Sequence, residues 1–370
     1  MMRILHKDFR KKHRGVALVT ALLVVSLATI MAVALTSRQY IDIRRTGNMM
    51  QSDQAYLDAI ASETFVGQLL ANFRDQQQSK FDDFALYDLA LTQLSSDMSD
   101  DNRLVSVQAA YPESKFNVNS LLTEVTAKDS DNTPKRTIYR RLLRSVIEDL
   151  DGDTGQTDAL VSSLMDWLDE DEEARLDGAE DSVYESKDPP YKAANRMLTS
   201  ISELRLIEGY TAELLDGVPA DEEQEIEAVD GLLAYVDALP DKDSTINVNG
   251  VVKPKIFMAL SNYIDLEMAD ALLQRQPYEN LNDFKKHEIF DEIKGTKSGA
   301  NGAHSGNRQN FETKELPKFG PLLDIQSSYF LIKSGVTVGK TTVGLNSLVY
   351  VSTDGTKLEI ISRAIGTDGI

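Results

Sequence analysis

The densest group of side chains capable of chemistry lies in residues 166–185, which hold ten carboxylates and one arginine. So many like charges repel one another unless a cation neutralises them. Calcium meets this need because it takes about six to eight hard oxygen ligands in irregular geometry, whereas magnesium demands strict octahedral coordination. The apolar residues Trp167, Leu168 and Tyr184 lie among the acids as possible anchors. The segment therefore predicts a calcium site, with a solvated acidic loop as the alternative.

Catalysis has no comparable set of residues. The four histidines are dispersed: His6 and His13 lie near the N-terminus, His287 in a charged helical stretch and His304 in a glycine-rich segment. The chain has no cysteine, so thiolate catalysis, disulfides and cysteine-type zinc sites are excluded. No GxSxG or HExxH motif occurs either. We therefore expect a protein that is not an enzyme.

Charge is distributed unevenly along the chain. The net charge is −20, yet residues 1–15 hold six basic residues and a single acid, so the remainder is more acidic still. Such a surface repels nucleic acid and attracts cations or basic partners. We expect no nucleic-acid partner.

The N-terminal region predicts the compartment. Residues 16–35 form a run of twenty without a charge. As a helix rising about 1.5 Å per residue, this run spans about 30 Å, the thickness of a membrane's hydrocarbon core. The basic leader before it should remain in the cytoplasm and place the rest of the chain outside. A buried helix of a soluble core is the alternative, but six cations rarely stand immediately before such a helix.

The helical pattern continues beyond the apolar run. No proline interrupts residues 38–73, where apolar residues recur among polar ones at Ile41, Met49, Tyr56, Ile60 and Phe65. This pattern predicts one long helix, half in lipid and half in water. An exported soluble protein is the alternative, because residues 31–34 (MAVA) imitate the cleavage motif of a signal peptide.

The soluble region mixes strands and helices. Alternating apolar residues predict strands within 103–119 and in three short segments over 328–361, separated by Gly335, Gly339 and a turn at 353–355. Helical spacing predicts helices over 137–150, 157–169, 202–207, 256–260 and 268–273. Residues 298–306, rich in glycine and small polar residues, predict a flexible loop. We expect an α+β fold in which early and late strands form one antiparallel sheet around a helical insertion, with two sequential domains as the alternative.

Two similar tetrapeptides, FNVN at 116–119 and INVN at 246–249, each precede a helical stretch. The second, with the apolar residues that follow it, resembles a degenerate helix-hairpin-helix module. Such modules can bind the DNA backbone, but no cluster of lysine and arginine supports that role here. Helix packing is the favoured interpretation.

The leader resembles a type IV prepilin signal. Residues 11–15 (KKHRG) precede the apolar helix, and in that family a dedicated prepilin peptidase cuts after the glycine, here between Gly15 and Val16. The family usually has phenylalanine first and glutamate fifth after the cut, whereas this chain has Val16 and Thr20. An intramembrane carboxylate is tolerated mainly when it is paired. A subunit at the tip of a filament has no neighbour above to pair with it, so Thr20 suits that position.

Together with the acidic insertion, this departure resembles the minor pseudopilin K family of type II secretion systems. The resemblance implies a pilin-like long N-terminal helix, a small antiparallel sheet and a large inserted all-α domain of helix-hairpin-helix or SAM-like type. The implied order is a leader over 1–15, a pilin helix over 16–75 that spans the membrane at 16–35, a first pilin-like α/β part over 76–119, an inserted helical domain over 120–245 with the acidic segment, and a last part over 246–370 with a helical pair, the glycine-rich loop and closing strands.

The resemblance also implies ligands and partners. Structural calcium is expected, and the residues carried over as its ligands are Asp169, Asp171, Glu180 and Asp181, with Glu173 and Asn195 as weaker candidates. The implied partners are minor pseudopilins I and J, other pseudopilins, the prepilin peptidase and the inner membrane, with the C-terminal domain in the periplasm. The implied function is to initiate or cap the secretion pseudopilus. A membrane-anchored calcium-binding domain outside any pilus and an exported hydrolase are the alternatives.

Overall fold

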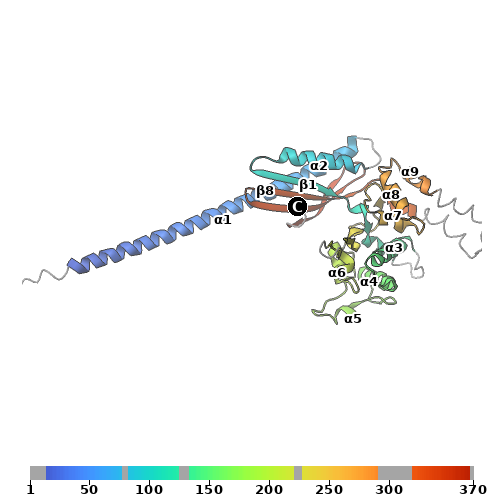
Figure 1. Ribbon diagram of the computed structural model, residues 1–370, viewed down its shortest axis with the longest axis horizontal. Coiled ribbons are helices and arrows are strands. Elements are labelled where there is room, and N and C mark those ends of the chain that lie inside the picture. Colours follow the sequence, from blue (N-terminus) through green and yellow to red (C-terminus); the bar gives the residue numbers. More distant parts are fainter. Residues whose placement is uncertain (1–13, 77–81, 125–132, 221–226, 291–318, 367–370) are drawn as a thin grey trace, which may run out of the picture.

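The computed structural model describes residues 14–76, 82–124, 133–220, 227–290 and 319–366. Figure 1 shows a long helix that extends from a body of two parts, a sheet covered by helices and a mainly helical region beside it. The architecture is thus a mixed α/β one with a long N-terminal helix, as predicted from the sequence. The leader and the glycine-rich loop predicted at 298–306 lie outside the described residues.

The long helix α1 runs from Arg14 to Gln76 without a break. Its 63 residues give a rod of about 95 Å at the usual rise per residue. Side chains in its first half are exposed, including the apolar run from Val16 onward. Within the described ranges, α1 alone is long and apolar enough to cross a membrane. Its N-terminal half therefore has no packing partner among the residues that the structure describes.

The second half of α1 packs on a four-stranded antiparallel sheet in the order β1-β8-β9-β10. The strands are β1 (Arg103–Ala110), β8 (Tyr329–Val338), β9 (Thr341–Val351) and β10 (Leu358–Ile365). Helix α2 (Phe84–Met98) covers the same face beside β1. The three late strands were predicted, and Gly339, at φ +62°, makes the left-handed turn between β8 and β9. Gly335, which was also expected to separate strands, lies inside β8. Strands distant in sequence thus form one sheet, on which the second half of α1 packs.

The face of α1 that packs on the sheet consists mainly of small and branched residues, Ala55, Ala59, Val66 and Leu70, all fully buried. Alanine lets the helix backbone approach the strands closely, and the side chains from β8 and β9 fill the layer between them. The pattern of larger apolar residues noted in the sequence coincides with this face only in part, because Tyr56 and Ile60 pack against the core whereas Ile41, Met49 and Phe65 are more than half exposed.

The helical region has a hydrophobic core of its own. The buried residues of this second core lie between Phe116 and Ile325 in the sequence. It is formed by α3 (Pro134–Asp149), α4 (Thr157–Leu168), α5 (Asp181–Tyr184), α6 (Ala212–Asp216), α7 (Pro254–Leu260), α8 (Leu266–Gln274) and α9 (Leu281–Lys285). Three two-residue pairs accompany the helices: β2 (Phe116–Asn117) with β5 (Val236–Asp237), β3 (Gly217–Val218) with β4 (Val229–Asp230), and β6 (Ile246–Asn247) with β7 (Leu323–Asp324). The core therefore extends across the predicted boundary at residue 245.

The two tetrapeptides adopt the same structure. Asn117 Oδ1 accepts from the N–H of Asn119 at 3.1 Å, and Asn247 Oδ1 accepts from the N–H of Asn249 at 2.9 Å. The first two residues of each tetrapeptide form a short parallel strand pair with a later segment of the chain. Phe116 and Asn117 pair with β5, and Ile246 and Asn247 pair with β7. The side-chain amide of the last asparagine then hydrogen-bonds to both the N–H and the carbonyl of one distant residue. Asn119 binds Leu198 in this way, and Asn249 binds Tyr278. The helical region is thus built from two units that begin alike.

Some sequence-based predictions need correction. The strand expected within 103–119 ends at Ala110, because Pro112 has no N–H for a sheet and starts a 3₁₀ turn that leads into the second core. The helix predicted over 202–207 is a 3₁₀ turn, Ile201–Leu206. Helix α2 was not predicted at all.

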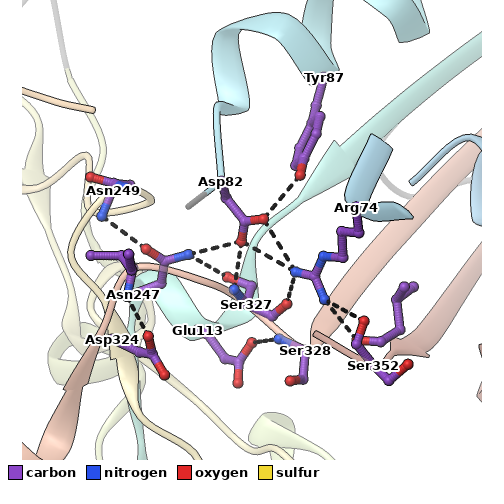
Figure 2. Close-up of polar contacts among 12 residues, drawn as sticks. Arg74, Asp82, Tyr87, Glu113, Asn247, Asn249, Asp324, Ser327, Ser328 and Ser352 are labelled. Carbon is purple, nitrogen blue, oxygen red and sulfur yellow. Dashed lines mark hydrogen bonds and ion pairs between the residues drawn. The ribbon is translucent and has the colours of Figure 1, made fainter. Parts of the chain in front are cut away.

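A buried ion pair joins the two cores (Figure 2). Arg74, in the last turn of α1, lies 3.2 Å from Asp82, and both side chains are at most 2% exposed. Arg74 Nη1 also donates to the carbonyls of Val351 and Ser352 at the end of β9. Charge-assisted bonds of this kind in a low-dielectric interior fix the orientation of the groups they join.

The helical region reaches the same pair through Asn247. Its Nδ2 donates to Asp82 Oδ2 at 3.1 Å and to Ser327 Oγ at 2.9 Å, while Tyr87 Oη donates to Asp82 Oδ1 at 2.9 Å. Nearby, buried Glu113 accepts the N–H of Tyr329 at 3.0 Å. We call Arg74, Asp82, Tyr87, Asn247 and Ser327 the polar hub. It fixes the helical region to the end of α1 and to the sheet.

Arg74→Met should lower the free energy of unfolding of the full chain in detergent micelles by about 3–5 kcal/mol, because it leaves the buried Asp82 charge without its counter-ion. Arg205→Met is the matched control, since the Arg205–Asp216 pair is about half exposed and should contribute only about 0–1 kcal/mol. Chemical denaturation measures both. Equal losses in the two variants would contradict the role assigned to the hub.

Candidate functional site

The acidic segment is a loop between α4 and α5 held by aromatic rings. Trp167, at the end of α4, contacts Tyr184 of α5 edge to face, with ring centroids 5.1 Å apart. Tyr191 stacks on Tyr184 at 5.4 Å, and its hydroxyl donates to the carbonyl of Leu206. These rings are the apolar anchors expected among the acids, and they bring the two ends of the loop together.

Three carboxylates converge inside this loop. Asp169, Asp171 and Glu180 each offer an oxygen, and these oxygens lie within 4.8 Å of one another. Asp169 and Glu180 are buried, with exposures of 2% and 3%, whereas Asp171 is exposed. In the described part of the chain, neither oxygen of Glu180 nor Oδ1 of Asp169 has a hydrogen-bond donor. Buried acceptors left in this way cost free energy unless a ligand satisfies them.

Arg175 supplies a positive charge on one side of the group. Its Nη1 lies 2.6 Å from Asp166 Oδ1 and 2.5 Å from Asp169 Oδ2. Its backbone N–H also donates to Asp166 Oδ2 at 3.1 Å. Asp166 is fully buried, so this pairing offsets the cost of burying its charge. The sequence had shown both residues within the acidic segment but had not indicated this pairing.

Glu180 has no ion pair within the described part of the chain. Burial, reinforced by the charges of Asp166, Asp169 and Asp181, raises the pKa of Glu180 to about 7. Burial likewise raises the pKa of Asp169, although Arg175 opposes this effect. A cation placed between these carboxylates would favour their ionised forms and remove the repulsion.

Asn195 completes the lining of the group. Its backbone is left-handed, with φ +46°, and its Nδ2 donates to the carbonyl of Asp171 at 3.2 Å. Its Oδ1 is buried and has no donor among the described residues. A neutral amide oxygen beside carboxylates is a common calcium ligand.

Two other predicted ligands lie apart from the convergent group. Asp181 binds Lys192 and accepts the N–H of Ala193 at 3.0 Å, and the bond from Lys192 lowers the pKa of Asp181. Glu173 is exposed, and only its backbone N–H reaches the group, donating to Asp171 Oδ1 at 2.9 Å. Of the six predicted ligands, the structure therefore brings together Asp169, Asp171 and Glu180, and Asn195 contacts Asp171 beside them.

These residues fit a hard divalent cation. They present carboxylate and amide oxygens, several of them buried without donors, in a loop fixed by aromatic packing. No nitrogen or sulfur ligand belongs to the convergent group, which favours calcium over zinc or copper.

A second functional feature is the N-terminal half of α1. Gly15 and Val16, the predicted cleavage position, lie in its first turn. The Thr20 hydroxyl is 3.1 Å from the carbonyl of Val16 and 3.0 Å from that of Ala17. Its donor is therefore satisfied within the helix and needs no partner in lipid.

A third feature is an exposed apolar stripe on the outer part of α1. Ile43, Met50 and Leu57 are spaced by seven residues and are 71%, 68% and 60% exposed. A spacing of seven keeps side chains on one side of a helix. At 100° per residue, this side is roughly opposite the face that packs on the sheet. The sequence pattern noted earlier missed this stripe because it mixed residues from different faces.

The sequence of this chain is similar to those of type II secretion system K proteins. A family model described as "Type II secretion system (T2SS), protein K" matches residues 114–219. The type II secretion system protein K of Pectobacterium carotovorum is 27% identical over 96% of this chain and 98% of its own. That of Pseudomonas aeruginosa is 28% identical over 98% and 95%, and that of Aeromonas hydrophila 27% over 96% and 98%.

A solved structure shares the fold. It is "The Crystal Structure of the GspK-GspI-GspJ complex from enterotoxigenic Escherichia coli Type 2 Secretion System", and one of its chains aligns with a TM-score of 0.61. The match covers 88% of this chain and 100% of that chain at 20% identity.

Proposed function

Because this chain belongs to the type II secretion system protein K family, we propose that it is a minor pseudopilin at the tip of the secretion pseudopilus. There it would initiate or cap assembly for protein export across the outer membrane. The observation that carries this proposal is α1, which is too apolar for water in its first half and bears an apolar stripe in its second. Both features suit a helix that lies in a bundle of similar helices.

The tip position is supported by Thr20. A glutamate at this place in the helix would need a cationic partner in lipid. Threonine needs none, because its hydroxyl is satisfied by the preceding turn. A subunit with no neighbour stacked above it can therefore enter the bundle without an unpaired buried charge.

The proposed orientation follows the charge of the leader. The basic residues before Gly15 remain in the cytoplasm, the prepilin peptidase cuts between Gly15 and Val16, and residues 16–35 span the inner membrane. The sheet and the helical region then lie in the periplasm. A structural role is proposed for the whole chain, with no catalytic step assigned to any of its residues.

The proposed partners are minor pseudopilins I and J. The related structure from enterotoxigenic Escherichia coli is by its title a complex of GspK with GspI and GspJ. In this chain, the stripe of Ile43, Met50 and Leu57 offers a surface that another long helix could cover, since it lies away from the chain's own sheet.

Leu57→Glu should reduce co-purification with pseudopilins I and J by at least about tenfold, because a charge would be buried in the helix interface. Leu89→Glu is the matched control, since Leu89 is 67% exposed but lies on α2, away from the stripe. Quantitative pull-down from membranes that express all three proteins measures both. Equal recovery of the partners by the two variants would rule out the stripe as the contact.

We propose further that the helical region is of helix-hairpin-helix type and serves packing. Helix α7 lies against both α3 and α8, and Lys255 of α7 pairs with Asp149 of α3 at 2.5 Å. The ammonium group of Lys255 thus forms an ion pair inside the protein. This supports a role of the module in helix packing rather than in nucleic-acid binding.

We propose calcium as the structural cofactor of the acidic loop. Asp169, Asp171 and Glu180 would supply carboxylate oxygens, with Asn195 beside them. The support is the set of buried oxygens that lack donors and lie close together. Bound calcium would neutralise the carboxylates and hold the loop in one conformation.

Calcium at about 100 times its dissociation constant should stabilise the soluble part by about 2.7 kcal/mol and raise its melting temperature relative to EDTA. Glu180→Gln should lose most of this gain, because it removes a buried ligand. Glu173→Gln, which removes an exposed acid from the same segment, should keep it. Differential scanning calorimetry with calcium and with EDTA measures the effect, and identical curves for the parent chain would remove calcium from the account.

A further inference from the structure

We propose that Arg175 is an internal counter-ion that competes with calcium for the acidic loop. The inference rests on the calcium site proposed above and names the residue that sets its affinity. It implies that the loop folds without metal and that calcium binds more weakly, and exchanges more readily, than the number of carboxylates suggests.

The guanidinium lies where a cation would be expected. A single nitrogen, Nη1, is within 2.6 Å of both Asp166 and Asp169, each of which is at most 2% exposed. The positive charge therefore neutralises part of the repulsion among the buried carboxylates before any metal arrives. Among the described residues, Glu180, Asn195 Oδ1 and Asp169 Oδ1 have neither a hydrogen-bond donor nor a short contact with Arg175, whereas Asp169 Oδ2 forms the ion pair with it.

Asp169 is shared between the two cations. Its Oδ2 pairs with Arg175, while its Oδ1 has no donor and lies in the convergent group. A calcium ion bound to Asp169 would lie on the order of 5 Å from the guanidinium, given metal–oxygen distances of about 2.4 Å. Like charges at this distance in a partly buried site repel strongly. Calcium binding must therefore overcome Arg175 or displace it.

The side chain of Arg175 is not needed to shape the loop. Asp166 is held by the backbone N–H of Arg175 at 3.1 Å, and the loop packs so closely there that a Cβ on Gly178 would lie 2.0 Å from Asp166 Oδ2. The backbone of Asp169 is fixed as the C-cap of α4, where its N–H donates to Met165. Removing the guanidinium should thus leave the ligands in place, while Asp166 loses its counter-ion and the metal-free loop becomes less stable.

Arg175→Met should bind calcium at least about tenfold more tightly than the parent chain. Isothermal titration of the full chain with calcium chloride in micelles measures the dissociation constant, and the fluorescence of Trp167, the only tryptophan of the chain, reports binding beside the site. Arg175→Lys keeps the charge and should bind like the parent. Arg205→Met, which removes the same charge from the Arg205–Asp216 surface pair, should leave the constant unchanged.

The outcomes separate the two proposals. If the parent chain binds no calcium, the proposed metal site is wrong. If the parent binds and Arg175→Met binds equally or more weakly, the site stands and the competing role of Arg175 is overturned. Arg175→Gln, which retains a donor for Asp169 without the charge, is the second variant should the methionine variant fail to fold in EDTA, and it must also bind at least tenfold more tightly.

Discussion

A charge buried between two cores fixes how this molecule is assembled. Arg74 at the end of α1 can be buried because Asp82 neutralises it and because the carbonyls of Val351 and Ser352 accept from its Nη1. Asn247 then links that pair to the helical region. Since a misplaced partner would leave a bare charge in a low-dielectric interior, the arrangement admits one geometry. The second half of the long helix, the sheet and the helical region are therefore held as one body.

In the acidic loop, as at the hub, a buried charge needs a partner, but here the chain supplies only part of the compensation. At the hub each buried charge has a partner from the chain itself. In the loop, Arg175 compensates Asp166 and one side of Asp169, while Glu180 has neither a hydrogen-bond donor nor an ion pair among the described residues. The hub is therefore a permanent joint, whereas the loop is the place where we propose that an exchangeable ion binds. Both rest on the cost of burying a charge alone.

The sequence predicted the elements whose pattern is local. A charge-free run followed by uninterrupted helical spacing predicted α1. Alternating apolar and polar residues, separated by glycine-containing turns, predicted β8, β9 and β10. The packed face of α1 was missed because Ala55 and Ala59 carry little hydrophobic signal, although small size is what close packing on the sheet requires. Asp181 was taken as a ligand, yet it begins α5 and binds Lys192, whereas its neighbour Glu180 points into the loop. The hub had no local signal, since Asn247 and Asp82 are 165 residues apart.

The proposed role rests on the claim that cleavage after Gly15 leaves α1 on the mature protein, with one half in lipid and the other available to neighbouring helices. Sequencing the N-terminus of the protein isolated from membranes tests this directly. The account predicts that the mature chain begins at Val16, cut after Gly15 with the apolar helix retained. A start at Met1 would indicate an uncut anchor, and a start near residue 35 would indicate loss of the helix; either result would contradict the claim.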